Sequence, residues 1–335
     1  MLAAIFPRLG KTQTLFSKPW KIRGACVGRA VCVDSPPDSM RLTPIIASKM
    51  LSDGGTTFGV VPKPLWQRAT PPDASNRIPH NAYAWLVTLD DGRRGLLDTG
   101  CGPAEFFSEK ERALAGLGTG WPLMEALTQL GVSPEQIEFV VLSHLHWDHV
   151  GGVSRFLAGG GRAPAFPRAQ HFVTRTEWAD ATSGDSLFYK AYPQAILEPL
   201  RQHPELLRLV DDTAPAILPG IELVRSSGHT RGHAVTVLQS ERLELVDASG
   251  GRGPTTHQAV LASDLCPTRH HLRMVFQLAY DTFPLDTRAW KRTWLPRLAA
   301  EHTVLLFDHD PNFYGGTIRP DEKQEFVLDV GWPLS

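Results

Sequence analysis

The feature that most constrains this chain of 335 residues is the stretch 140–152, which reads VVLSHLHWDHVGG. A short apolar run ends in three histidines and one aspartate within six positions. The apolar run predicts a buried strand. The polar cluster then lies at the carboxyl end of that strand, where α/β folds carry their chemistry. His144 and His146 are two residues apart, so an extended backbone directs both side chains the same way.

The polar cluster has the composition of a metal site. Imidazole and carboxylate groups are ligands that Zn²⁺ and other borderline divalent metals accept. In an ordinary core, His144, His146, Asp148 and His149 would carry a desolvation cost without compensation. The cluster therefore predicts a metal centre rather than four structural polar residues.

Length and composition exclude several classes of protein. The chain has 42% hydrophobic residues, enough for a large core in one α/β domain or two small ones. The formal net charge of −1 gives no general attraction to nucleic acid or to an anionic membrane. No apolar run is long enough to span a bilayer. Four cysteines without paired spacing favour a reducing compartment, so a cytoplasmic protein is the simpler expectation.

Residues 1–39 differ from the rest of the chain. Six lysines and arginines precede the first acidic residue, Asp34. This composition is typical of an organelle transit peptide, which would make the protein mitochondrial. The alternative is a spurious upstream start, with Met40 opening the true domain. Under both readings the segment 1–39 is an extension, and we expect the functional domain to cover residues 40–335.

Strands that end in ligand-type residues recur along the chain. Apolar runs at 221–224, 258–262 and 303–307 predict strands, and they precede His229, Asp264 and His309. Further predicted elements are strands at 41–46, 84–89, 95–97, 170–174, 234–238 and 244–246, helices near 123–130 and 285–300, and an irregular stretch at 53–72. The segment 177–209 is predicted to hold helical patches broken by prolines. This rhythm indicates an α/β fold with two similar halves.

The motif His-x-His-x-Asp-His at 144–149 resembles the signature of the metallo-β-lactamase superfamily. The resemblance extends to LLDTG at 96–100, GHTRGH at 228–233, Ser263-Asp264, and Asp-His-Asp at 308–310, in the family's order. It implies a four-layer αβ/βα sandwich with the metals between two sheets at one edge.

The resemblance also implies a ligand set and a mechanism. One metal would be held by His144, His146 and His229, and a second by Asp148, His149 and His309. Asp264 would bridge two Zn²⁺ ions together with a hydroxide that attacks an ester-like bond. Asp148 or Asp264 would pass the proton to the leaving group.

The family contains several activities that fit this ligand set. We expect a small-molecule substrate, first a lactone as in N-acyl-homoserine lactonases, with phosphotriester hydrolysis as the alternative. Some lactonases place a carbonyl-binding tyrosine shortly after the bridging aspartate; this chain has none there, which leaves His270 or Tyr280 as substitutes. A mononuclear iron sulfur dioxygenase is the competing enzyme class, and a binding module on an inactive scaffold is the third hypothesis. A homodimer is kept as one option for the oligomeric state.

Several other side chains have a functional and a structural interpretation. Asp98 is expected to orient a metal ligand or to cap a turn, and His233 to support the site rather than to bind metal. Phe58 and Trp66 either form substrate walls or pin a loop to the core. The same two readings apply to a group of aromatic residues that would line a pocket, namely Trp178, Phe188, Tyr189 and Tyr192.

Overall fold

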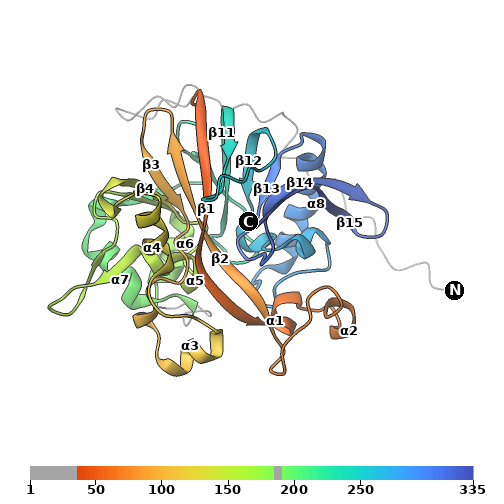
Figure 1. Cartoon of the computed structure of the whole chain (residues 1–335), viewed down its shortest axis with the longest axis horizontal. Coiled ribbons are helices and arrows are strands. Elements are labelled where there is room, and N and C mark those ends of the chain that lie inside the picture. The colour runs from red at the N-terminus through yellow and green to blue at the C-terminus, as the bar shows by residue number, and fades with distance from the viewer. Residues whose placement is uncertain (1–35, 185–190, 335) are drawn as a thin grey trace.

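A long antiparallel pair, β1 (Ser39–Asp53) and β2 (Arg77–Leu89), forms the middle of the fold. The computed structural model describes residues 36–184 and 191–334. The first residues of β1 also pair in parallel with β11 (Ala234–Leu245). Strand β1 therefore joins the two halves of one hydrogen-bonded sheet, whose main path runs β15-β14-β13-β12-β11-β1-β2-β3-β4-β7-β8 (Figure 1).

The half that follows β2 contains most of the helices. Its strands are β3 (Arg94–Leu97), β4 (Ile137–Val141), β7 (Gln170–Thr174) and β8 (Leu207–Val210), with a separate hairpin of β5 (Ser154–Phe156) and β6 (Arg162–Pro164). Its helices are α3 (Glu109–Ala115), α4 (Pro122–Gln129), α5 (Trp147–Val150), α6 (Arg175–Thr182) and α7 (Gln194–Gln202). Figure 1 shows α4, α6 and α7 grouped on this side of the sheet.

The second half is mostly strand. It comprises β9 (Ala216–Leu218), β10 (Ile221–Arg225), β11, β12 (Thr256–Leu261), β13 (Val304–Leu306), β14 (Phe313–Asp321) and β15 (Glu325–Pro333). The long helix α8 (Pro284–Ala300) lies against it. Two short helices, α1 (Gly54–Phe58) and α2 (Lys63–Trp66), follow β1 at the edge of the molecule.

Three apolar clusters divide the molecule into layers. The inner cluster contains residues of both half-sheets, so the two halves face one another across it. In β13, Val304 and Leu306 enter that inner cluster, while Leu305 joins an outer cluster with Trp290 of α8. A second outer cluster packs α4 and α7 against the first half. Central strands such as β4, β12 and β13 are buried on both faces, which explains their continuous apolar runs in the sequence. The layers are helix, sheet, sheet and helix, as predicted.

Some predicted elements are wrong in detail. The two predicted sheets are hydrogen-bonded into one through β1, and the strands predicted at 234–238 and 244–246 are one strand, β11. The stretch 53–72 is not irregular throughout, because Asp53 caps α1 by accepting a hydrogen bond from the Thr56 amide at 2.8 Å. Pro199 lies inside α7 rather than ending it, because the apolar face of that helix is buried.

Two predictions lie partly outside the described residues. Residues 1–35 are among those not described, so the two interpretations of the N-terminal segment stay predictions. Phe188 and Tyr189 are also outside the described ranges. Within those ranges, none of the helices combines the length and the apolarity needed to cross a bilayer.

Candidate metal centre

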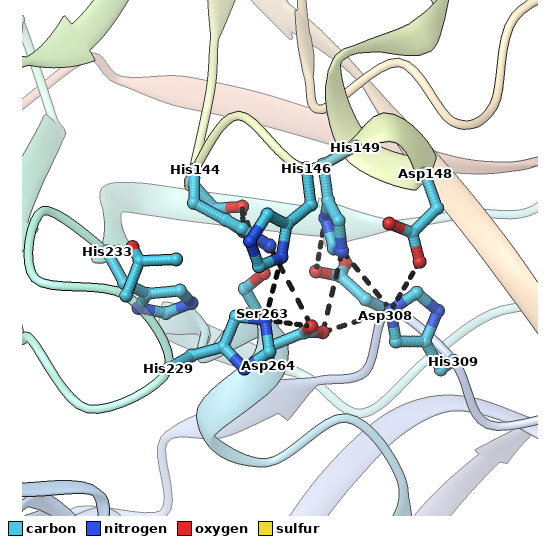
Figure 2. Close-up of polar contacts among 12 residues, drawn as sticks. His144, His146, Asp148, His149, His229, His233, Ser263, Asp264, Asp308 and His309 are labelled. Atoms are coloured by element: carbon cyan, nitrogen blue, oxygen red, sulfur yellow. Dashed lines mark hydrogen bonds and ion pairs between the residues drawn. The ribbon is translucent and has the colours of Figure 1, made fainter. Parts of the chain in front are cut away.

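The loops that follow β4, β10, β12 and β13 meet at one edge of the sheet. The loop after β4 carries the first histidine cluster and runs into α5, while the turn η6 (Ser263–Leu265) carries Asp264. The structure brings all seven sequence-predicted ligands together there (Figure 2), namely His144, His146, Asp148, His149, His229, Asp264 and His309.

The first group of facing ligand atoms comprises His144, His146, His229 and Asp264. Nε2 of His229 lies 3.0 Å from Nδ1 of His146 and 3.0 Å from Oδ2 of Asp264. Nε2 of His144 lies 3.8 Å from that same oxygen. All four side chains are buried, so only a small species can lie among them.

The second group lies around the other oxygen of the same carboxylate. Oδ1 of Asp264 is 3.0 Å from Nε2 of His309 and 3.5 Å from Nε2 of His149. Those two Nε2 atoms are 3.2 Å apart, and Oδ2 of Asp148 is 3.8 Å from the His309 nitrogen. Asp264 therefore directs one oxygen to each group (Figure 2).

Hydrogen bonds behind the histidines fix which nitrogen faces inward. Nδ1 of His309 lies 2.7 Å from the carbonyl oxygen of Asn81, which can only accept, so Nδ1 carries the proton. Nδ1 of His149 faces Asp98 Oδ2 at 3.0 Å, and Nδ1 of His229 faces Asp281 Oδ1 at 3.0 Å. In their neutral forms these three rings carry bare Nε2 lone pairs, and those of His149 and His309 face one another. Lone pairs at 3.2 Å repel, and a cation between them removes the repulsion.

Asp98 organises the loop as well as His149. Its Oδ1 accepts a hydrogen bond from the Ser143 amide at 2.8 Å, and its Oδ2 accepts from the Ser143 hydroxyl at 2.7 Å. The Ser143 oxygen lies 3.1 Å from Nδ1 of His144 and accepts from the Ser263 hydroxyl at 2.9 Å. Asp98 and Ser263 have φ of 50° and 49°, a strained region for non-glycine residues. Asp98 therefore contacts His149 directly and reaches His144 through Ser143, which favours the orienting role over the turn cap.

The site is electrostatically suited to cations. Burial alone would raise the pKa of Asp264, but the surrounding imidazoles of His229, His149 and His309 lower it well below its usual range. Burial disfavours the charged form of His309, yet the Asp264 carboxylate raises its pKa to about 9. The Asp264 carboxylate thus stabilises positive charge within the second group. Either protons on the imidazoles or a metal ion can supply that charge.

Nε2 of His144 is buried at the centre of the first group and has no hydrogen-bond partner among the described residues. Oδ1 of Asp264 is buried as well, and the groups within ion-pair distance of it are the imidazoles of His309 and His149. Buried polar atoms of this kind are normally paired, because an orphan costs about 1–3 kcal/mol. Imidazole nitrogens with carboxylate oxygens form a donor set that suits zinc, so the residues fit the metals that the sequence predicts.

A cavity of about 380 Å³ opens onto the two groups. Its wall includes ligand side chains, Trp147, and apolar residues such as Met50 and Leu278. Tyr280 also lines the cavity, and its hydroxyl lies 2.5 Å from the Thr56 hydroxyl. His270 is not among the lining residues; it packs on Phe58 instead.

Most of the described aromatic residues proposed as substrate walls pack in apolar clusters instead. Phe58 and Trp66 are each 1% exposed and stack on one another in a small cluster, so they pin this segment to the core. Trp178 packs against the outer cluster of the first half. Tyr192 is closer to the site, with its ring centroid 5.3 Å from that of His146.

Some supporting residues carried no signal in the sequence. Glu177 accepts hydrogen bonds from the Leu145 amide at 2.9 Å and the Thr230 hydroxyl at 2.6 Å, and so ties two ligand loops together. Asn81 contributes its backbone carbonyl oxygen, and a sequence motif cannot identify a residue that acts through its backbone. His233 lies beside His144 with ring centroids 5.2 Å apart, but it belongs to neither ligand group.

Comparison with known proteins agrees with this geometry. Residues 77–243 match the metallo-beta-lactamase superfamily. The N-acyl homoserine lactonase AiiB of Agrobacterium fabrum is 32% identical over 173 residues, which are 48% of this chain and 59% of AiiB. An N-acyl homoserine lactonase of a Bacillus species is 26% identical over 131 residues, 38% of this chain and 44% of that protein. The chain therefore spans only about half the length of these relatives.

Solved structures share the fold over most of the chain. A probable metal-dependent hydrolase from Staphylococcus aureus aligns with a TM-score of 0.72 and 24% identity, covering 90% of this chain and 99% of its own. AidC, a dizinc quorum-quenching lactonase, aligns with a TM-score of 0.63 and 19% identity, covering 86% and 94%. At these identities the likeness shows the fold alone. Taken with the matched residues and the converging histidines, it shows that the chain carries a metallo-β-lactamase superfamily domain.

Proposed function

We propose that the protein is a metal-dependent hydrolase that holds two divalent ions, in the first instance zinc, and cleaves a lactone or a related ester. The observation that carries this proposal is the placement of Asp264, which turns Oδ2 toward one histidine group and Oδ1 toward the other. A carboxylate in that position suits a bridge between two ions. A mononuclear site would not need the second group.

The chain supplies two ligand sets for these ions. His144, His146 and His229 would hold the first, Asp148, His149 and His309 the second, with Asp264 shared. When bound, such ions supply Lewis acidity and lower the pKa of water toward neutrality. Asp98 and Asp281 hold the imidazoles of His149 and His229 in the orientation that presents Nε2.

Asp148 is the acid best placed to move a proton. Its side chain is 16% exposed and lines the cavity, whereas that of Asp264 is 7% exposed and faces imidazoles on both sides. Asp148 can therefore accept a proton at a carboxylate oxygen and deliver it to the leaving-group oxygen. Asp264 would instead stay ionised and bind the metals.

The cavity supports a small ester with an apolar part. Its volume lies in the range of small-molecule sites, and Met50, Leu51 and Leu278 give it an apolar wall. The curated relatives are named N-acyl homoserine lactonases, which favours a lactone as the first substrate to test. Tyr280 supplies a hydroxyl to the same wall, and we assign to it the contact with the substrate carbonyl.

The test is metal analysis combined with a substrate panel on the purified full chain. We expect two zinc ions per chain and hydrolysis of γ-lactones that is faster than hydrolysis of phosphotriesters. Faster phosphotriester turnover would support the alternative hydrolase activity. One iron per chain with oxygen consumption on a persulfide substrate would overturn the proposal in favour of a sulfur dioxygenase.

A further inference from the structure

A second cavity of about 420 Å³ lies beside the first. Trp147 lines both cavities, and Ala191 in the wall of one is two residues from Pro193 in the wall of the other. The second cavity lies between α3 and α7, and most of its lining is apolar, including Phe106, Phe107 and Ile196. The two cavities therefore share the Trp147 side chain as part of their walls.

Arg162, the first residue of β6, lines this second cavity. Its guanidinium carbon lies 3.8 Å from the ring centroid of Phe106 and 4.5 Å from that of Phe156. Such cation–π contacts favour one orientation of the guanidinium plane. The aromatic rings thus fix the position of a positive charge in an apolar wall.

Nothing in the described part of the chain neutralises this charge. Nη1 of Arg162 is buried and has no hydrogen-bond partner, and no carboxylate among residues 36–184 and 191–334 forms an ion pair with it. Burial lowers the pKa of Arg162, and no acidic group opposes that shift. Other arginines of the chain are paired with carboxylates, among them Arg175, Arg201, Arg225 and Arg231.

Glu111 is the acidic residue in the same wall, and it is engaged elsewhere. Its Oε2 accepts hydrogen bonds from the Ser108 amide at 2.8 Å and the Ser108 hydroxyl at 2.7 Å, which form the cap of α3. Glu111 therefore does not serve as a counter-ion for Arg162. Its negative charge in the same cavity disfavours a polyanion and favours a ligand with a single charge.

We propose that Arg162 binds a carboxylate carried by the substrate itself, at the end of an apolar segment that crosses Trp147. A guanidinium presents N–H groups that match a carboxylate, and the aromatic walls match the apolar segment. The substrate class is then an ester or lactone whose acyl chain ends in a carboxylate. This inference rests on the proposed hydrolase function and names its substrate more closely.

The test compares substrates that differ only in the distal group. The probes are the mono-para-nitrophenyl esters of adipic, suberic and sebacic acid, and the same esters with the distal carboxylate converted to a carboxamide. We expect wild type to favour the carboxylate by about 10- to 100-fold in kcat/KM for at least one chain length. Arg162→Met should bring that ratio close to one. Arg175→Met, which changes an exposed arginine that lines neither cavity, should leave it unchanged.

A binding measurement separates this inference from the proposed function. Calorimetry on the unreactive anilides of the same acids, with and without the distal carboxylate, reports recognition without turnover. Tighter binding of the carboxylate forms that disappears in Arg162→Met supports the anion site even if no ester is hydrolysed. Equal binding of both forms to wild type at every chain length would overturn the anion site and leave the hydrolase proposal standing.

Discussion

Asp281 offers a direct test of how the chain prepares its metal ligands. Its Oδ1 lies 3.0 Å from Nδ1 of His229, and both side chains are buried, with 0% and 1% exposed. The change Asp281→Asn keeps the shape of the side chain but removes its charge. The amide can still accept the proton of Nδ1, but a neutral acceptor makes His229 a weaker ligand.

The expected loss follows from that one hydrogen bond. Removing a partner that orients a ligating histidine typically lowers metal affinity about 10- to 100-fold, which is roughly 1.4–2.7 kcal/mol. The assay is competition for zinc against a chromogenic chelator, with thermal melting of the apoprotein to check the fold. We expect Asp281→Asn to lower the zinc affinity of the weaker of the two binding steps.

A control lies five residues along the same segment. Asp286 also accepts a hydrogen bond from a side chain, the Ser227 hydroxyl at 3.1 Å, but this contact is exposed and away from the ligand atoms. Asp286→Asn should bind zinc as wild type does. Zinc affinity of Asp281→Asn within twofold of Asp286→Asn would refute the argument that the buried carboxylate tunes His229.

Three other predictions concern the metal groups, the cavity and the core. His144→Ala should lose the first metal and at least about 100-fold of the hydrolytic rate, since it removes one of the three histidines that would hold that ion with Asp264; full activity would contradict the assignment. Tyr280→Phe should raise KM or lower kcat for lactones with unchanged metal content, as measured by steady-state kinetics. Burial lowers the pKa of His171 from 6.5 to about 4. The unfolded chain therefore binds more protons between these values, and the stability that this residue contributes above pH 6.5 is lost as pH falls toward 4. His171→Leu should reduce the drop in unfolding free energy between pH 7.5 and pH 5 by about 2 kcal/mol, measured by urea titration; an equal drop in both proteins would exclude the effect.

The sequence predicted the centre of the fold better than its periphery. Each candidate ligand follows an apolar strand, and the family resemblance implied that His144, His229 and His309 lie at one edge. The central strands β4, β12 and β13 are buried on both faces, so they stand out in the sequence as continuous apolar runs. Periodicity could not show that β1 extends to Asp53 and joins both halves, because that depends on pairing with β2 and β11.

The supporting contacts were harder to foresee. The supporting role of Asp98 could be inferred because this residue lies in the LLDTG motif at 96–100. Asp281 and Glu177 act across 52 and 53 residues of sequence, and their partners are known only after folding. The apolar surroundings of Arg162 are likewise a result of tertiary packing, since its aromatic partner Phe106 comes from a distant segment.

The central claim is that Asp264 joins two metal ions in one centre. The most direct measurement is the zinc content per chain of wild type and Asp264→Asn, determined by elemental mass spectrometry after equilibration with limiting and then saturating zinc. We expect two ions in wild type and a lower, weaker loading in Asp264→Asn, because a neutral amide cannot hold both groups together. One ion per chain in saturated wild type, or two equally tight ions in Asp264→Asn, would contradict it.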